Sequence, residues 1–146
     1  MTASERIHAT CVALAEGAVL LRGPSGSGKS DLALRLIDDG ASLVADDQTL
    51  IERSGDGLMA FAPPTICGQM EVRGLGLVSV QSLEKAPLAL VVDLVDMTPE
   101  RLPDSETVDI LGVALPLLRL RAFEASAPAK LRLALRELGT AKESDR

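Results

Sequence analysis

The sequence is poor in aromatic residues: its 146 positions hold no tryptophan, no tyrosine and two phenylalanines. Proteins that bind single-stranded nucleic acid stack bases on aromatic side chains, and proteins that follow a phosphate backbone concentrate lysine and arginine. This chain instead carries a formal net charge of −6. The two shortages together argue against nucleic acid as a partner.

Cysteines and long apolar runs are also scarce. Cys11 and Cys67 are too few and too far apart for a metal framework, and nothing at the start of the chain reads as a signal peptide. We therefore expect two reduced thiols. The most apolar run, LALVVDLV at 88–95, contains an aspartate and is too short to cross a bilayer. A cytoplasmic protein with no membrane partner is the expectation.

The remaining composition, 47% hydrophobic and 25% charged, is that of one ordinary globular domain over residues 1–146. AVLLR at 18–22 predicts a strand, and DLALRLIDDG at 31–40 predicts a helix. ASLVADDQTLIER at 41–53 is typical of a strand broken by two acids. The turn sequence SGDG at 54–57 predicts a hairpin with the following LMAFA.

The second half of the chain adds further strands and one helix. The expected elements are a glycine-rich, then alternating segment at 71–80, a strand buried on both faces at 88–97, a polar loop at 97–109, a strand at 113–120 and a helix at 127–141. We expect the tail at 139–146 to fray. The sequence therefore predicts a single α/β domain with a mixed sheet.

Residues 23–30, GPSGSGKS, match the phosphate-binding pattern G-x-x-x-x-G-K-[ST] in full. The predicted cradle consists of Gly23, Pro24, Ser25, Gly26, Ser27, Gly28, Lys29 and Ser30. Glycines let backbone N–H groups surround phosphate oxygens, and the following helix directs its positive end to the same place. Lys29 would reach the terminal phosphates and Ser30 the Mg²⁺ of a nucleotide complex. A flexible glycine-serine turn is the alternative, but the strand before and the helix after favour a phosphate site.

A phosphate loop also needs a carboxylate that holds the metal or takes a proton from the attacking hydroxyl. Asp46 and Asp47 compete for this role with Asp93 and Asp96, which lie in an apolar strand. Side chains on a strand alternate between faces, so Asp46 and Asp47 can serve one site only if their strand bulges or ends there. We expect one of the pair to do chemistry and the other to support it. Solvation of a strand end is the alternative for both pairs.

Two further residues stay open on pattern alone. Glu71, next to Arg73 and ahead of two glycines that would allow close backbone approach, is either a magnesium ligand or a surface charge. His8 is the only histidine, and a single histidine near a chain start is commonly a surface or capping residue.

Four segments in order, IHAT at 7–10, GPSGSGKS at 23–30, LVADD at 43–47 and EVRGLG at 71–76, resemble the catalytic domain of the HPr kinase/phosphorylase family. The resemblance implies a P-loop domain related to that of phosphoenolpyruvate carboxykinase, and a homo-oligomer, typically a hexamer. It implies a magnesium-dependent enzyme that uses ATP or pyrophosphate to phosphorylate a serine of the phosphocarrier protein HPr. In the reverse reaction, phosphate removes the phosphoryl group and pyrophosphate is released.

Position by position, the resemblance makes the 23–30 loop the nucleotide cradle and Ser30 with Glu71 the magnesium ligands. It adds His8 and Lys29 to the active centre and places the proton-transfer aspartate in the Asp46–Asp47 pair, of which we favour Asp47. Further site positions that it implies are the shared catalytic surface at 72–81, with Arg73, Gly74 and Gly76, and an active-site arginine at Arg101.

The sequence departs from the family pattern in two places. The resemblance begins at residue 7, so we expect no counterpart of the family's N-terminal domain and the loss of some regulation. The glycine-arginine-asparagine stretch that the family uses for dephosphorylation has its nearest match in PAKL at 128–131, with Lys130 in place of arginine. Lysine does not reproduce the bidentate geometry of a guanidinium on phosphate, so the phosphorylase activity stays open.

Two other functions remain compatible with a phosphate loop. A small-molecule kinase would need an arginine-bearing lid, for which Arg119, Arg121, Arg132 and Arg136 are candidates. A nucleotide-sensing module without catalysis would bind nucleotide and transfer nothing. HPr kinase is the prediction that accounts for all four segments.

Overall fold

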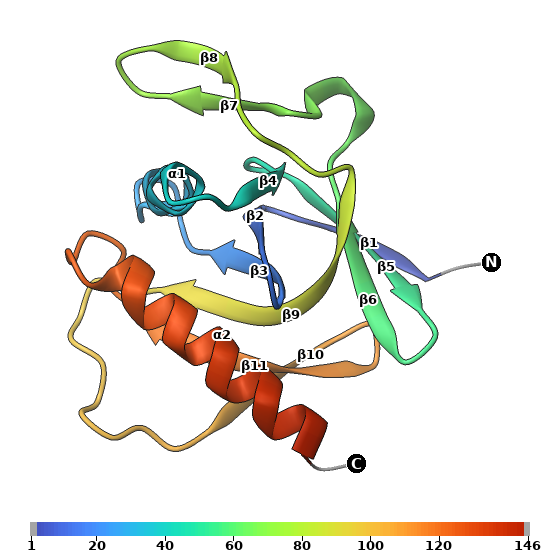
Figure 1. Ribbon diagram of the computed structural model, residues 1–146, viewed down its shortest axis with the longest axis vertical. Coiled ribbons are helices and arrows are strands. Elements are labelled where there is room, and N and C mark those ends of the chain that lie inside the picture. The colour runs from blue at the N-terminus through green and yellow to red at the C-terminus, as the bar shows by residue number, and fades with distance from the viewer. Residues whose placement is uncertain (1–2, 145–146) are drawn as a thin grey trace.

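The computed structural model describes the backbone of residues 3–144 and the side chains of residues 3–138. Nine of its strands form one curled mixed sheet (Figure 1). The strands are β1 (Ser4–Ile7), β2 (Ala9–Leu14), β3 (Gly17–Arg22), β4 (Ser42–Ala45), β5 (Thr49–Ser54), β6 (Gly57–Phe61), β9 (Lys85–Leu94), β10 (Glu106–Ile110) and β11 (Val113–Leu120). The other elements are the helices α1 (Lys29–Asp38) and α2 (Ala127–Ser144), the short η1 (Pro64–Ile66) and the hairpin β7 (Gln69–Val72) with β8 (Gly76–Ser79).

The long strand β9 joins the two halves of the sheet. Its first residues pair antiparallel with β6, whereas its second half pairs parallel with both β3 and β11. The main order is β1-β5-β6-β9-β3-β2-β4, and β10 pairs with β11 at the other edge. The expected mixed sheet is therefore confirmed, and the ends of the parallel strands β3 and β9 lie together where the phosphate loop begins.

The sheet is buried on both faces because its central strands alternate between two cores. In β3, Val19 and Leu21 join the cluster that packs against α1 and α2, while Ala18 and Leu20 join the cluster on the opposite face. Figure 1 shows α2 crossing β9 and α1 beside β4 and β2. Such strands read as continuous apolar runs, which is why the sequence predicts β3 and β9 well.

The expected elements agree with the structure except at two places, the loop after β9 and the strands β1 and β2. The hairpin of β5 and β6 turns at the expected residues, 54–57. The predicted loop at 97–109 is too long, because Glu106–Ile110 forms the edge strand β10. Strands β1 and β2 have no counterpart among the predicted elements. Helix α2 ends at Ser144. Fraying is predicted for residues 139–146, of which 145 and 146 lie outside the described residues.

The two cysteines are free, as expected. Cys11 is buried in β2 and Cys67 is exposed. Burial in apolar surroundings raises the pKa of the Cys11 thiol well above its ordinary value. Within residues 3–144, neither helix has the length and apolarity that a bilayer span would need.

Candidate active site

The phosphate loop connects β3 to α1, as the sequence predicts. Gly28 precedes the first helical residue with a left-handed backbone, φ 101°, and no side chain caps the helix. The first-turn N–H groups of α1 are therefore available to an anion, and the helix dipole favours negative charge there.

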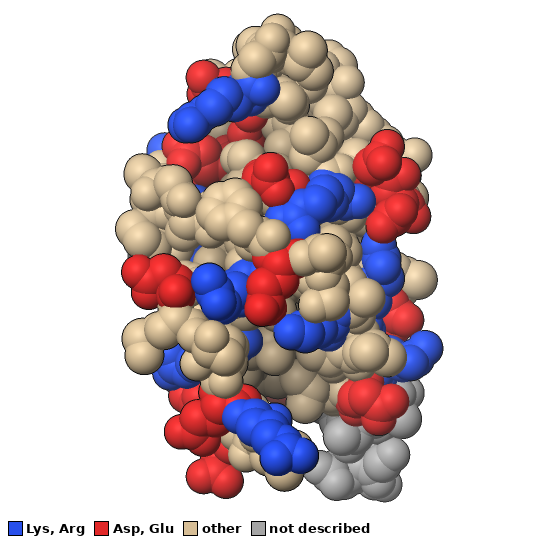
Figure 2. Space-filling view, turned by 90° about the vertical axis from the view of Figure 1, so that its left-hand side faces the viewer, with Lys and Arg blue, Asp and Glu red and all other residues tan. Residues whose placement is uncertain are grey.

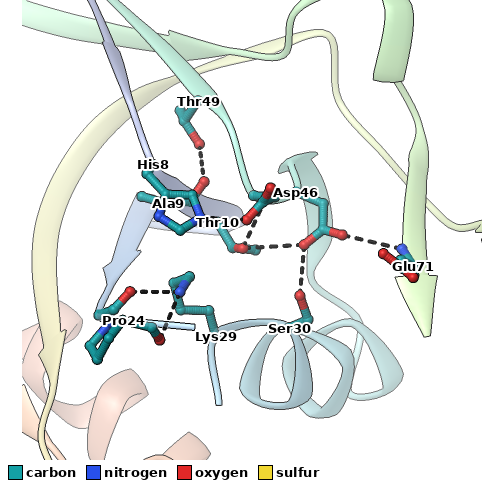
Figure 3. A network of polar contacts seen from close by, with 11 residues as sticks. His8, Ala9, Thr10, Pro24, Lys29, Ser30, Asp46, Thr49 and Glu71 are labelled. Carbon is teal, nitrogen blue, oxygen red and sulfur yellow. Dashed lines mark hydrogen bonds and ion pairs between the residues drawn. The ribbon is translucent and has the colours of Figure 1, made fainter. Parts of the chain in front are cut away.

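Lys29 and Ser27 show how the loop is arranged inside. The Lys29 side chain is folded back, so that Nζ donates to the carbonyl oxygens of Gly23 at 2.6 Å and Pro24 at 3.2 Å (Figure 3). Among the described side chains, the Ser27 hydroxyl is the buried polar group that has no hydrogen-bond partner. A buried hydroxyl without a partner is costly. A phosphate oxygen would satisfy it, so the loop fits the group that its sequence predicts.

Asp46 ties the phosphate loop to the rest of the site (Figure 3). Its residue is 8% exposed, and both carboxylate oxygens accept hydrogen bonds. Oδ1 accepts from the hydroxyls of Ser30 at 2.8 Å and Thr10 at 3.2 Å, and Oδ2 accepts from the backbone N–H of Glu71 at 3.2 Å. One buried carboxylate thus links α1, β2 and β7.

Asp47 differs from its neighbour in both exposure and contacts. Strand β4 ends at Ala45, and Asp47 has a left-handed backbone, φ 68°, which turns its side chain out of the strand. The Asp47 side chain is 65% exposed, and its Oδ1 lies 2.6 Å from His8 Nε2. Its backbone N–H donates to the Thr10 hydroxyl at 3.1 Å. The condition for both acids to reach one site, a strand that ends there, is met.

These groups meet in a cavity of about 570 Å³. The lining includes P-loop residues, Asp46, Asp47, Glu71 and Arg73. No group of three or more His, Cys, Asp or Glu side chains gathers as a ready metal site in the part of the chain that is described. Magnesium bound with a nucleotide takes ligands mainly from phosphates and waters, so one hydroxyl and one carboxylate are a sufficient protein contribution. The Ser30 hydroxyl and the Glu71 carboxylate fit that requirement.

A second cavity of about 690 Å³ adjoins the loop on the side of residues 24–27. Its lining includes Asp96, Met97, Arg121 and Phe123. The segment after β11 lies directly against the P-loop, because a Cβ on Gly28 would come within 2.7 Å of the Ala122 Cβ. Phe123 lines both cavities.

Several predicted residues lie elsewhere. Arg101 is exposed in the loop between β9 and β10 and lines neither cavity. Lys130, in the first turn of α2, also lies outside both linings, and its Nζ donates to Glu124 at 3.2 Å. Asp93 forms a two-bond ion pair with Arg22, at 2.8 and 3.1 Å, which joins the ends of β9 and β3.

The glycines of the β7–β8 turn were expected to allow close backbone approach, and within this chain nothing approaches them. Gly74 and Gly76 have φ of 95° and 94°, and nothing lies within 4 Å of a Cβ built on either. Their positive φ permits the tight turn of the hairpin.

Three residues in or beside the two cavities are not predicted individually from the sequence. Thr10 bridges Asp46 and Asp47, and its only signal is its place in IHAT. Arg121 is expected only as one of several lid arginines, yet it lines the second cavity. Phe123 belongs to no motif, and its signal is the rarity of aromatic residues in the chain.

The face that carries α1, the segment after β11 and the hairpin tip has mixed charge. Figure 2 shows Lys and Arg side chains interspersed with Asp and Glu over this face. Within the phosphate loop itself, positive charge is supplied by Lys29 and by the N-terminal end of α1.

A P-loop between a central strand and a helix, with two acids at the end of β4, defines a P-loop domain of the mixed α/β type. A family model described as HPr Serine kinase C-terminal domain matches residues 1–131, and the chain belongs to this family. An HPr kinase/phosphorylase of Chlorobium phaeobacteroides is 39% identical over 80% of this chain and 38% of its own length. One of Cupriavidus metallidurans is 41% identical over 70% of this chain and 36% of its own length.

The fold has a close counterpart among solved structures. The Hpr(Ser) kinase/phosphatase from Coxiella burnetii superposes with a TM-score of 0.84, covers 96% of this chain and 93% of that one, and is 24% identical. The expected fold, similar to the phosphoenolpyruvate carboxykinase-like P-loop fold, is confirmed. The chain spans less than half the length of the curated relatives named above.

Proposed function

We propose that this chain is a magnesium-dependent protein serine kinase that transfers the terminal phosphoryl group of ATP to a serine of HPr. The observation that carries the proposal is the hydrogen-bonded chain Ser30–Asp46–Thr10–Asp47, which connects a phosphate loop to an exposed carboxylate beside His8. Membership of the HPr serine kinase C-terminal domain family supports HPr as the substrate. A cytoplasmic location and a homo-oligomeric state, a hexamer as in the family, belong to the same proposal.

Asp47 is the proposed base. Its exposed carboxylate pairs with His8, whereas the two oxygens of Asp46 accept hydrogen bonds from three donors. The Asp46 carboxylate is buried and holds groups of three elements in place, whereas the exposed Asp47 carboxylate is accessible to a substrate hydroxyl. Asp47 takes the proton of the serine hydroxyl as that oxygen bonds to phosphorus, and His8 holds the Asp47 carboxylate in place.

The phosphate loop supplies the electrostatic part. Lys29 and the first N–H groups of α1 neutralise charge that develops on the transferring phosphoryl group and on the leaving nucleotide. Ser30 and Glu71 would hold a bound magnesium ion, which would supply further positive charge to the nucleotide phosphates. Asp46 fixes the Ser30 hydroxyl and the backbone of Glu71, so it positions both proposed ligands.

Transfer from labelled ATP to purified HPr tests the proposal directly. We expect magnesium-dependent label on one HPr serine. If HPr stays unlabelled while the chain binds ADP, the proposal fails and a nucleotide-sensing module takes its place. Faster ADP release with a metabolite than with HPr would instead identify a small-molecule kinase.

The reverse reaction is tested on the labelled product. Inorganic phosphate is added to phosphoserine-HPr with the enzyme, and pyrophosphate is measured. Lys130 lies outside both cavities and pairs with Glu124, so we expect much slower reversal than forward transfer. Replacement of ATP by pyrophosphate in the forward assay then decides whether pyrophosphate is also a donor.

A further inference from the structure

Phe123 is an exposed aromatic side chain placed over the phosphate loop. Its side chain belongs to one of only two phenylalanines in the sequence, and the residue is 68% exposed. Its Cζ atom would lie 3.0 Å from a Cβ built on Gly28, so the ring edge rests on the last glycine of the loop. A large apolar side chain left in water beside a polar cavity offers a contact surface to a ligand.

The backbone around Phe123 is held in place by α1. The guanidinium of Arg35 donates to the carbonyl oxygen of Ala122 and, at 3.3 Å, to that of Glu124. Arg35 is itself fixed by Asp31, whose Oδ1 accepts from Nε at 2.9 Å. The residues on both sides of Phe123 are thus bound to the helix that begins at the phosphate loop, and the ring is preorganised over that loop.

The ring lies where the two cavities adjoin. The first cavity contains Lys29, Ser30 and the two acids, which are the groups suited to phosphates, metal and proton transfer. The second contains none of them and is lined instead by Met97, Arg121 and the outer residues of the loop. A ligand with its phosphates in the loop and a planar end at the border of the two cavities would contact the ring.

We propose that the ring of Phe123 is the stacking platform for the base of the nucleotide whose phosphates the P-loop holds, an inference that rests on the proposed function. Aromatic rings stack on every base because each base has a π-face. The platform gives affinity for nucleotides over bare pyrophosphate and discriminates little between adenine and guanine.

The test compares two ligands that differ by the nucleoside. Isothermal titration calorimetry measures the Kd of Mg-ADP and of Mg-pyrophosphate for wild type, Phe123→Ala and Phe123→Tyr. We expect Phe123→Ala to weaken Mg-ADP by about tenfold or more, the loss typical of one base–aromatic stack. Mg-pyrophosphate binding stays unchanged, Phe123→Tyr restores Mg-ADP binding because it keeps the ring, and Mg-GDP follows Mg-ADP.

Leu133→Ala is the matched control, because Leu133 is 50% exposed on α2 and lines neither cavity. It should leave both affinities unchanged. An unchanged Mg-ADP affinity in Phe123→Ala would overturn the stacking role and leave the proposed kinase intact. Equal weakening of both ligands would also overturn it, since the residue would then support the loop. If wild type binds neither ligand, the phosphate site and the proposed function fail with it.

Discussion

Asp46 and Asp47 are adjacent in the chain but differ in what their carboxylates contact. Asp46 is buried and accepts hydrogen bonds from three elements, while Asp47 is exposed and contacts His8. The sequence alone favours the pair over Asp93 and Asp96. It favours Asp47 as the base but does not show how the contacts of the two carboxylates differ. That difference depends on where β4 ends and on a positive φ at Asp47, which are tertiary features.

Asp47→Asn tests the proposed base. An amide cannot take the serine proton, so we expect phosphotransfer to HPr to fall by about 10²–10⁴-fold. Calorimetric binding of Mg-ADP should stay within about twofold, because the Asp47 carboxylate is exposed and pairs with His8 outside the loop. Asp56→Asn, an exposed acid in the β5–β6 turn, is the control. A transfer rate in Asp47→Asn within about tenfold of wild type would assign the proton to another group.

Thr10→Val tests whether the link between the two acids matters for catalysis. Valine keeps the shape but removes the hydroxyl that Asp46 and the Asp47 N–H both use. We expect a loss of about 1–3 kcal/mol in the free energy of unfolding, measured by urea denaturation, together with slower phosphotransfer.

Thr49→Val separates the two effects. Thr49 is equally buried, but its hydroxyl donates to the Ala9 carbonyl oxygen at 2.9 Å and contacts neither acid. We expect a comparable loss of stability with phosphotransfer unchanged. Equal activity losses in both threonine variants would mean that stability alone explains the Thr10 effect.

At the level of elements, the unit β3–loop–α1 carries the site and is the part that the sequence predicts best. Its signals are local: an apolar run, glycines at fixed spacing and apolar residues at helical spacing. The segment after β11 completes the site and could not be predicted, because its contact with Gly28 joins residues about a hundred positions apart. Arg101 was expected from order along the chain, whereas Arg121 lines the cavity next to the loop.

Gly28→Ala tests the packing of these two elements. Alanine at φ 101° is strained, and its Cβ would lie 2.7 Å from that of Ala122 and 3.0 Å from the Phe123 ring. Gly26→Ala has φ 83° but nothing within 4 Å, so it isolates the strain. We expect Gly28→Ala to lower the free energy of unfolding, measured by urea denaturation, by about 1–3 kcal/mol more than Gly26→Ala does. Equal losses would mean that the segment after β11 moves aside without cost.

At the level of the whole molecule, one apolar cluster unites the sheet with both helices. It contains Leu21 of β3, Leu32 of α1, Leu90 of β9 and Leu131 of α2, all fully buried. The sequence predicts the helical side of Leu131, Leu135 and Leu138 from their spacing. Strands β1 and β2 are not predicted, and β1 in particular is exposed, with stability that comes from pairing with β5.

Leu131→Ala tests how strongly α2 contributes to this cluster. Removing a fully buried leucine leaves a cavity, so we expect a loss of about 2–5 kcal/mol in the free energy of unfolding by urea denaturation. Leu133→Ala, two residues along the same helix and half exposed, should change it by less than about 1 kcal/mol. Similar values for the two variants would show that α2 packs more loosely than its burial indicates.

The exposed ring of Phe123 also has an optical consequence. Because the chain holds no tryptophan and no tyrosine, the protein has no intrinsic tryptophan or tyrosine fluorescence. A Phe123→Trp substitution would therefore introduce a single emitter at the edge of the phosphate loop, where the wild-type side chain is already in water. Its emission would follow occupancy of that loop in real time, without any background from the remainder of the protein.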